Sequence, residues 1–468
     1  MYEHDQLVAA GRAAAGALTD QSEWVHRRVE RISFPSPDEP VYRRHVSVDF
    51  TIPKELKPVH PASSSPRFYV PLSLVLKWPP LLRLDLRNGS GEPIPFLTGA
   101  QNALLDEAVL LALAEGATSR ELTEDVQTAI HAVTKDRSEA DQGLRYLLPS
   151  PNEPGELDEL DEVRKQLRED SVFVAAAGGL RDSTFLWLRV AGEPGDREIV
   201  KFSYDIPMKV KVGKWSAPSF GLRAFIADFA SPHIGSSSSY HLTISAPASI
   251  KVVDSAIHLR KGPTISTEPN ELAEVLAECS AATSPQKTQT LTMYTEPVGD
   301  QGRFYLTGSR AGCIGTARVA LISDKSLARN ATLSAVLIAL LLTAYANRLT
   351  QVLELNEAAV TLALVAPALL AYLLVRPAQH EFARSFTAGI RRALALSGLL
   401  PILGAATIVL SGGDTSQALS DSFAGLAILA WLFAGVLGLG AFLPRGKRSK
   451  PLSAYGVGNE ADRHDALD

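Results

Sequence analysis

The pattern that comes nearest to a phosphate-binding site is the glycine-rich stretch at residues 308–315, which reads Gly-Ser-Arg-Ala-Gly-Cys-Ile-Gly. Such loops bind phosphate through backbone N–H groups and the N-terminus of a following helix, and a P-loop adds a Lys followed by Ser or Thr. This stretch lacks that Lys, and strand-like sequences lie on both sides of it. We therefore predict a hairpin connection here, and no cofactor.

Metal-binding and nucleophilic patterns are also missing. A zinc site needs His or Cys ligands at short spacing, whereas the ten histidines are scattered and neither HExxH nor CxxC occurs. Asp254, Ser255 and His258 are close in sequence, but catalytic triads assemble from distant positions, and no Gly-x-Ser-x-Gly turn is present. The two cysteines, Cys279 and Cys313, are too few for a disulfide framework and fit a reducing compartment. We predict no catalytic residue, no metal and no enzymatic activity.

A basic cluster between residues 23 and 45 is the first candidate for a binding surface. Each basic residue close to an anionic leaflet contributes about 1 kcal/mol to membrane attraction. The cluster is therefore either a contact for lipid headgroups or an ordinary solvated strand edge and loop. The candidate headgroup contacts are Arg27, Arg28, Arg31, Arg43 and Arg44.

A second charged cluster lies at residues 376–392, between two apolar runs. His380, Glu381 and Arg384 are about one helical turn apart, so they could dock the soluble region or a headgroup on one side of a helix. The alternative is that the basic residues only anchor the chain at the membrane surface. The candidate docking residues are His380, Glu381, Arg384, Arg391 and Arg392.

The last third of the chain contains a series of apolar runs that would place the protein in a membrane. None of the four runs contains Asp, Glu, Lys, Arg or His, and each has about the 17–25 residues that a helix needs to cross a bilayer. We predict a bundle of four transmembrane helices within residues 331–443. The runs are residues 331–347, 358–375, 393–411 and 423–443.

The charged flanks of these runs predict the orientation. Ten Lys and Arg residues flank one side of the predicted bundle, and only Arg348 lies on the other. Because positive residues accumulate in cytoplasmic loops, both termini should be cytoplasmic in a multi-pass protein of the cell membrane. The first twenty residues lack the apolar stretch of a secretory signal, which agrees with a cytoplasmic soluble region.

The soluble region reads as α+β. We expect a β-rich segment at residues 1–97, a helical insertion at 98–170 and an antiparallel β-sandwich-like domain at 171–323, with a basic and then disordered tail at 444–468. This pattern fits either one β-rich domain with an insertion or two domains joined near Asp170. The last strand runs almost directly into the first apolar run, so the β-rich region should lie close to the inner leaflet.

Local signals make these expectations more specific. Thr98-x-x-Gln101 and Thr118-x-x-Glu121 both match the capping box at a helix start, and Gly116 is a natural helix end. Residues 185–190 and 198–204 flank a turn-rich connection, so they should form a β-hairpin.

The leading interpretation is a non-enzymatic binding, scaffold or sensor module at the inner membrane face, with the lipid bilayer and another protein as partners. Net charge is only −5 and is spread out, which argues against a nucleic-acid partner. The first alternative is a small channel or lipid-handling protein that forms a homo-oligomer and is gated by its cytoplasmic domain. The second alternative is a membrane-surface enzyme whose site the sequence does not reveal.

Overall fold

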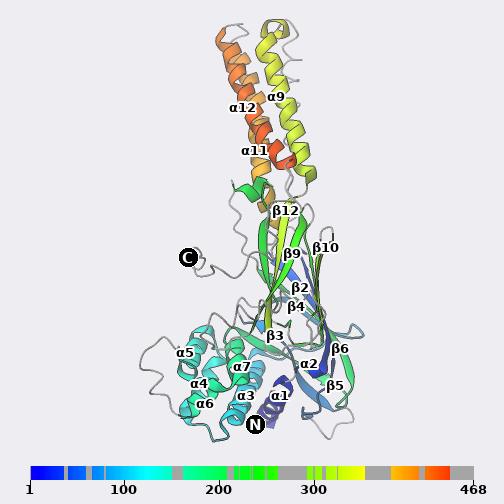
Figure 1. Ribbon diagram of the computed structural model, residues 1–468, viewed down its shortest axis with the longest axis vertical. Coiled ribbons are helices and arrows are strands. Elements are labelled where there is room, and N and C mark those ends of the chain that lie inside the picture. Colours follow the sequence, from blue (N-terminus) through cyan, green and yellow to red (C-terminus); the bar gives the residue numbers. More distant parts are fainter. Residues whose placement is uncertain are drawn as a thin grey trace.

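A computed structural model of the chain shows a mixed α/β N-terminal region followed by long apolar helices at one end of an elongated molecule (Figure 1). The helices of the soluble region lie at the other end, where the N-terminus is also found, and the β-sheets lie between the two groups of helices. The structure describes residues 2–19, 21–35, 41–59, 66–77, 81–149, 162–207, 216–220, 222–231, 233–234, 236–247, 250–261, 292–298, 301–307, 313–323, 325–353, 381–410 and 417–442.

The largest sheet has seven strands in the order β10-β11-β8-β1-β2-β6-β4. All its pairs are antiparallel except β1 with β8. Strands from both sides of residue 170 therefore lie in one sheet. The strands are β10 (Thr292–Val298), β11 (Gln301–Thr307), β8 (Ser239–Ser245), β1 (Val25–Ser33), β2 (Val41–Thr51), β6 (Arg197–Pro207) and β4 (Leu82–Asn88).

Two smaller sheets cover the inner face of the large one. The three-stranded sheet contains β7 (Phe225–Ser231), β12 (Cys313–Ser323) and β9 (Ile250–Lys261), and the two-stranded sheet pairs β3 (Arg67–Leu76) with β5 (Ser183–Ala191). Side chains of β1 and β8 pack against those of β7, β9 and β12 in one apolar core, as in a β-sandwich. A second core joins β2 and β6 to β3, β5 and the helices.

The helices of the soluble region pack together on the β3–β5 side (Figure 1). The helix α1 approaches α3 so closely that a Cβ on Gly11 would lie 2.7 Å from Ala108 Cβ. The predicted capping box at Thr98 is confirmed, because its side chain accepts from Gln101 N and the Gln101 side chain accepts from Thr98 N. These helices are α1 (Tyr2–Thr19), α2 (Gln21–Trp24), α3 (Gly99–Thr118), α4 (Glu124–Val133), α5 (Arg137–Leu147), α6 (Glu162–Glu169) and α7 (Ser171–Asp182).

The structure corrects several local predictions. Thr118 ends α3 instead of capping the next helix, because its hydroxyl donates to Ala114 O, while Thr123 precedes α4. The helix α3 passes through Gly116 and ends at Thr118, and Ser119 follows as the C-cap residue with φ 51°. Residues 171–182, expected to begin the β-sandwich, form α7, since Asp170 caps them by accepting from two backbone N–H groups.

Two predicted hairpins are also wrong. The strands β5 and β6 pair with β3 and with β2 and β4, so they belong to different sheets. The same is true of β11 and β12, which flank the glycine-rich stretch. Residues 308–312 of that stretch lie outside the described residues.

Three of the four predicted apolar runs form helices that are long and apolar enough to cross a membrane. The run at residues 358–375 lies outside the described part of the chain. The helices are α9 (Lys325–Leu353), α11 (Glu381–Leu410) and α12 (Gln417–Phe442), with apolar segments at Leu327–Asn347, Thr387–Leu410 and Gln417–Phe442. Large apolar side chains such as Leu333, Ile428 and Leu432 are exposed on them, as expected of a lipid-facing surface.

Candidate binding face

The outer face of the seven-stranded sheet is the most distinctive exposed surface of the soluble region. Side chains alternate between the two faces of a strand. On β1 the even-numbered residues from Arg28 to Ile32 are buried, whereas Arg27 and Arg31 are exposed. On β2 the residues from Arg44 to Phe50 alternate in the same way, and His45 is exposed. The described part of the chain places no second layer over this outer face.

Strand register brings polar residues of four strands into two neighbouring rows on this face. Arg31 lies opposite His45, which lies opposite Ser203, which lies opposite Asp85. The second row runs through Val29, Ser47, Lys201 and Arg87.

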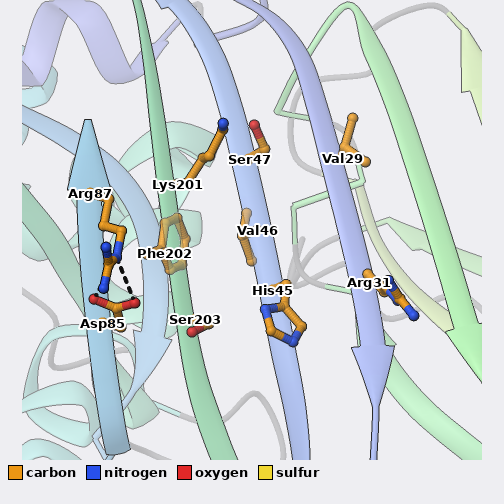
Figure 2. A pocket seen from close by; sticks show the side chains of 10 residues that line it. All are labelled: Val29, Arg31, His45, Val46, Ser47, Asp85, Arg87, Lys201, Phe202 and Ser203. Atoms are coloured by element: carbon orange, nitrogen blue, oxygen red, sulfur yellow. Dashed lines mark hydrogen bonds and ion pairs between the residues drawn. The ribbon is translucent and has the colours of Figure 1, made fainter. Parts of the chain in front are cut away.

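A shallow, open pocket of about 270 Å³ lies between these rows (Figure 2). The backbone of the sheet forms its floor at Val46 and Phe202, whose side chains alternate to the buried inner face. The rest of its lining is Val29, Arg31, His45, Ser47, Asp85, Arg87, Lys201 and Ser203.

Positive charges outnumber negative charges on the outer face of β1, β2, β6 and β4. Each carboxylate is already paired: Asp205 with Arg43 and Arg83, Asp85 with Arg87, and Asp49 with Arg197. The Arg197 guanidinium bonds Asp49 at 2.7 and 2.6 Å and, by this hydrogen bonding, lowers the pKa of that carboxyl. The cations are Arg27, Arg31, Arg43, Arg83, Arg87, Arg197 and Lys201, and the carboxylates are Asp49, Asp85 and Asp205.

Three cations remain in surplus after these pairs are made. Arg27, Arg31 and Lys201 are exposed and form no ion pair with any residue that the structure describes. The neighbouring histidines respond to the same field: burial lowers the pKa of His45, and Arg43 and Arg31 lower it further. Burial and then Arg27 lower the pKa of His241. Both histidines are therefore neutral at pH 7, and the positive potential comes from the Arg and Lys side chains.

A buried ion-pair network lies beneath this face and fixes the two strands that carry it. Arg28 Nε donates to Glu30 Oε1 at 2.7 Å, and Arg44 NH1 lies 3.4 Å from Glu30 Oε2. All three side chains are at most 3% exposed. Burial alone would raise the pKa of Glu30, but Arg44 and Arg28 outweigh it and lower the pKa to about 2. Arg44 also donates to the carbonyl of Ala230 in the opposing layer.

The network continues to His233, which follows β7. Arg28 NH2 donates to Ser73 Oγ at 2.7 Å, and His233 Nε2 lies 3.0 Å from that oxygen and 2.8 Å from Leu74 O. Burial, followed by the charge of Arg28, lowers the pKa of His233 to about 3, so the ring is neutral. This polar layer separates the two apolar cores along β1 and β2. We interpret this network as having a role in stability and not in binding, because its side chains are buried from solvent and interact with one another.

The structure divides the first cluster predicted from sequence. Arg27, Arg31 and Arg43 reach the outer face, whereas Arg28 and Arg44 are only 1% and 3% exposed and cannot meet a lipid headgroup. Burial of these two arginines was missed because both interpretations of the basic cluster, a headgroup contact or a solvated strand edge and loop, place its side chains in contact with water or lipid headgroups. The alternation of residues 25–33 contains the signal, since Arg28 shares its phase with Ile32.

The second predicted cluster lies at the base of the membrane helices. His380 lies outside the described residues, while Glu381 and Arg384 belong to α11. Arg391 and Arg392 are half-buried on the same helix.

A different segment of the soluble region packs against the membrane helices. It is η1 (Ala217–Phe220), a short 3₁₀ turn that follows β6 in the chain. Phe220 is 9% exposed and packs in the core of the helical bundle. A Cβ on Gly389 would lie 2.6 Å from Ser219 Oγ and 2.9 Å from the Phe220 ring, and a Cβ on Gly440 would lie 2.6 Å from Phe220 O. These two glycines form a notch for η1 between α11 and α12. Sequence analysis did not find this contact.

One buried acid outside these sites has a strongly shifted pKa. Burial raises the pKa of Asp106 on α3 to about 7, although hydrogen bonds from Thr184 and Trp187 oppose the shift. Thr184 Oγ1 lies 2.6 Å and Trp187 Nε1 2.8 Å from its carboxyl oxygens. Shifted groups are common in active sites, but Asp106 is 1% exposed and is not among the residues that line the pocket on the sheet face.

The described residues contain no group of three or more His, Cys, Asp and Glu side chains that could hold a metal ion. Ser255 is 6% exposed on β9, away from the outer face of the large sheet. No protein-family model, curated protein sequence or solved structure matches the chain.

Proposed function

We propose that this chain is a membrane-anchored, non-enzymatic binding module that acts as a scaffold or sensor. Its long apolar helices hold the soluble region at the membrane, and the outer face of the seven-stranded sheet contacts another protein. The observation that carries the proposal is the surplus of cations on this face. Arg31 and Lys201 line the open pocket and Arg27 lies on the same strand as Arg31, and none of the three is ion-paired with a residue that the structure describes. Charged groups arranged in this way steer a complementary partner and set specificity.

The chemistry of the face supports contact better than catalysis. The acids and the histidine with the most strongly shifted pKa values, Glu30, Asp106 and His233, are all buried and do not line the pocket. Acid–base catalysis needs such groups within hydrogen-bond reach of a substrate. The pocket instead offers charged side chains, the hydroxyl groups of Ser47 and Ser203, and the neutral ring of His45.

The cytoplasmic side is the proposed location of this face. The ends of the membrane helices nearest the soluble region carry the positive flanks of the sequence, including Arg329, Arg391 and Arg392. Positive-inside bias places those ends, and with them both chain termini, in the cytoplasm.

Site-specific photocrosslinking in cells tests the binding function. A photoreactive amino acid is placed at Ser47 on the pocket wall, and at the exposed Gln142 on α5 as a matched control. We expect a discrete crosslinked species from position 47 that disappears in the Arg31→Glu/Lys201→Glu background and is not formed from position 142. Absence of any species specific to position 47, or its persistence in the charge-reversed background, would reject the sheet face as the binding surface.

A small channel or lipid-handling protein gated by its cytoplasmic domain is the second candidate, and the η1 contact favours it. Phe220 is inserted between α11 and α12, so a movement of the soluble region would change the packing of these two helices. In this case the protein should form a homo-oligomer and pass ions or lipids across liposomes, at a rate changed by Phe220→Ala. If liposomes show no flux of ions or lipids with the wild-type protein or with the Phe220→Ala variant, this candidate function is rejected.

A further inference from the structure

We infer that the partner presents an extended acidic protein segment to the outer sheet face, with one apolar side chain seated in the pocket. This inference rests on the proposed binding function and names its ligand class. Three features of the face carry it: the spacing of the unpaired cations, the form of the pocket, and the direction of the face relative to the membrane helices.

The unpaired cations are spaced for several separate carboxylates. Arg27 and Arg31 are four residues apart on one strand, which is about 13 Å along a β-strand. Residues four apart on an extended partner segment have the same spacing. Lys201 lies two strands away from Arg31 and one row along, which places their Cα atoms roughly 12 Å apart. Arg31 and Lys201 therefore border the pocket from different strands, and Arg27 lies farther along β1, so the three cations do not gather at one point.

The pocket suits a single side chain better than a free small molecule. Its volume of about 270 Å³ lies below the roughly 300–1,000 Å³ of typical small-molecule sites, which also enclose most of their ligand. This pocket is open and shallow on the surface of the sheet. The side chain of Val29 and the aliphatic stems of Lys201 and Arg87 can contact an apolar group there, while their charged ends remain in water.

Two other anionic partners, lipid headgroups and nucleic acid, fit this face less well. The strands of the large sheet extend away from the membrane helices along the length of the molecule (Figure 1). The outer face is therefore roughly parallel to the bilayer normal, and only its end nearest the membrane helices approaches the headgroups. Nucleic-acid binding commonly uses exposed aromatic side chains for base stacking. The outer positions of β1, β2, β6 and β4 carry no Phe, Tyr or Trp.

The test measures binding to the full-length protein in nanodiscs of zwitterionic lipid. The probe is a fluorescent peptide in which glutamates alternate with leucines, and the control peptide has glutamine in place of every glutamate. We expect the acidic peptide alone to bind, and more weakly as salt rises. Arg31→Glu/Lys201→Glu should weaken binding about tenfold or more, because two ion pairs become two repulsions. Arg27→Glu should weaken it independently.

A matched double reversal on the helices, Arg145→Glu/Lys165→Glu, makes the same change in net charge at exposed positions away from the sheet. It should leave peptide affinity within about twofold of wild type, as expected for screened distant charges. Equal losses in both double variants, or no binding of the acidic peptide, would overturn the inference. Binding confined to nanodiscs with anionic lipid, or to single-stranded DNA, would also overturn it. If position 47 still captures a partner in cells while the peptide fails, the binding function stands and only its acidic ligand is wrong.

Discussion

The glycine notch makes a quantitative prediction about how the soluble region is held against the membrane helices. In the Gly440→Ala variant the new methyl group would lie 2.6 Å from the carbonyl oxygen of Phe220. A carbon and an oxygen atom do not approach closer than about 3.3 Å, so the backbone of η1 must retreat by about 0.7 Å. Gly389→Ala meets Ser219 Oγ and the Phe220 ring at 2.6 and 2.9 Å, and should have a similar effect.

The expected cost follows from the packing of Phe220. Forcing an extra methyl group into a packed site costs about 1–3 kcal/mol. Burial of a Phe side chain contributes a comparable amount, about 1.5–3 kcal/mol. Docking of η1 should therefore weaken by about 1–3 kcal/mol, which raises the undocked population by a factor of about 5–150.

Hydrogen exchange of the nanodisc-bound protein measures this population. The amides of Ser219 and Leu222 are bonded within the turn, at 2.9 Å to Ser216 O and Ala217 O, and exchange once the turn leaves the bundle and frays. Gly435→Ala and Gly425→Ala are matched controls on α12, since a Cβ at either position meets no neighbouring atom within 4 Å. If Gly440→Ala exchanges no faster than Gly435→Ala, the notch does not hold the soluble region.

The remaining predictions concern buried ionisable groups, read from urea unfolding of the soluble region of the nanodisc-bound protein. Glu30→Ala leaves Arg28 and Arg44 buried without a carboxylate and should cost about 3–5 kcal/mol; a loss below 1 kcal/mol would contradict the proposed network. Because the folded pKa of His233 is lowered from 6.5 to about 3, its contribution to stability is lost as pH falls from 6.5 towards 3, by about 1.4 kcal/mol per pH unit. Because the folded pKa of Asp106 is raised from 3.8 to about 7, its contribution has the opposite sign and is lost as pH rises from 3.8 through 7. In the wild-type protein the two contributions change in opposite directions between pH 4 and 6.5. The His233→Asn variant should therefore be more stable at pH 4.5 than at pH 6.5, and the Asp106→Asn variant should be less stable at pH 4.5 than at pH 6.5. Equal pH profiles in the two variants would refute both assignments.

Periodicity and capping signals predicted most individual elements but not their partners. The alternating segments form strands, and Thr98 caps α3 as its capping box indicates. Pairing is a different matter, because alternation shows which residues share a face and not which strand lies beside them. For this reason the separation of β5 from β6 and the parallel pairing of β1 with β8 were not predicted. The helix α7 was missed although Asp170, a good N-cap residue, precedes it.

The candidate site was only partly visible in the sequence. The basic character of residues 23–45 pointed to a surface, but the buried ion pair of Arg28 and Glu30 interrupts the apolar alternation that would mark β1 as a strand. The contribution of Lys201 depends on β6 lying beside β2, which only the fold reveals. The notch at Gly389 and Gly440 has no local signal, since each glycine is defined by a segment at least 169 residues away in the chain.

The central claim, that the outer sheet face can meet a cytoplasmic partner, requires this face to lie on the inner side of the membrane, and labelling of one cysteine tests that location most directly. Ser47→Cys is introduced on the pocket wall after Cys279→Ser and Cys313→Ser remove the native thiols. A membrane-impermeant maleimide should label this cysteine in inverted vesicles and leave it unlabelled in intact cells. Labelling in intact cells would place the face outside the membrane and contradict the account.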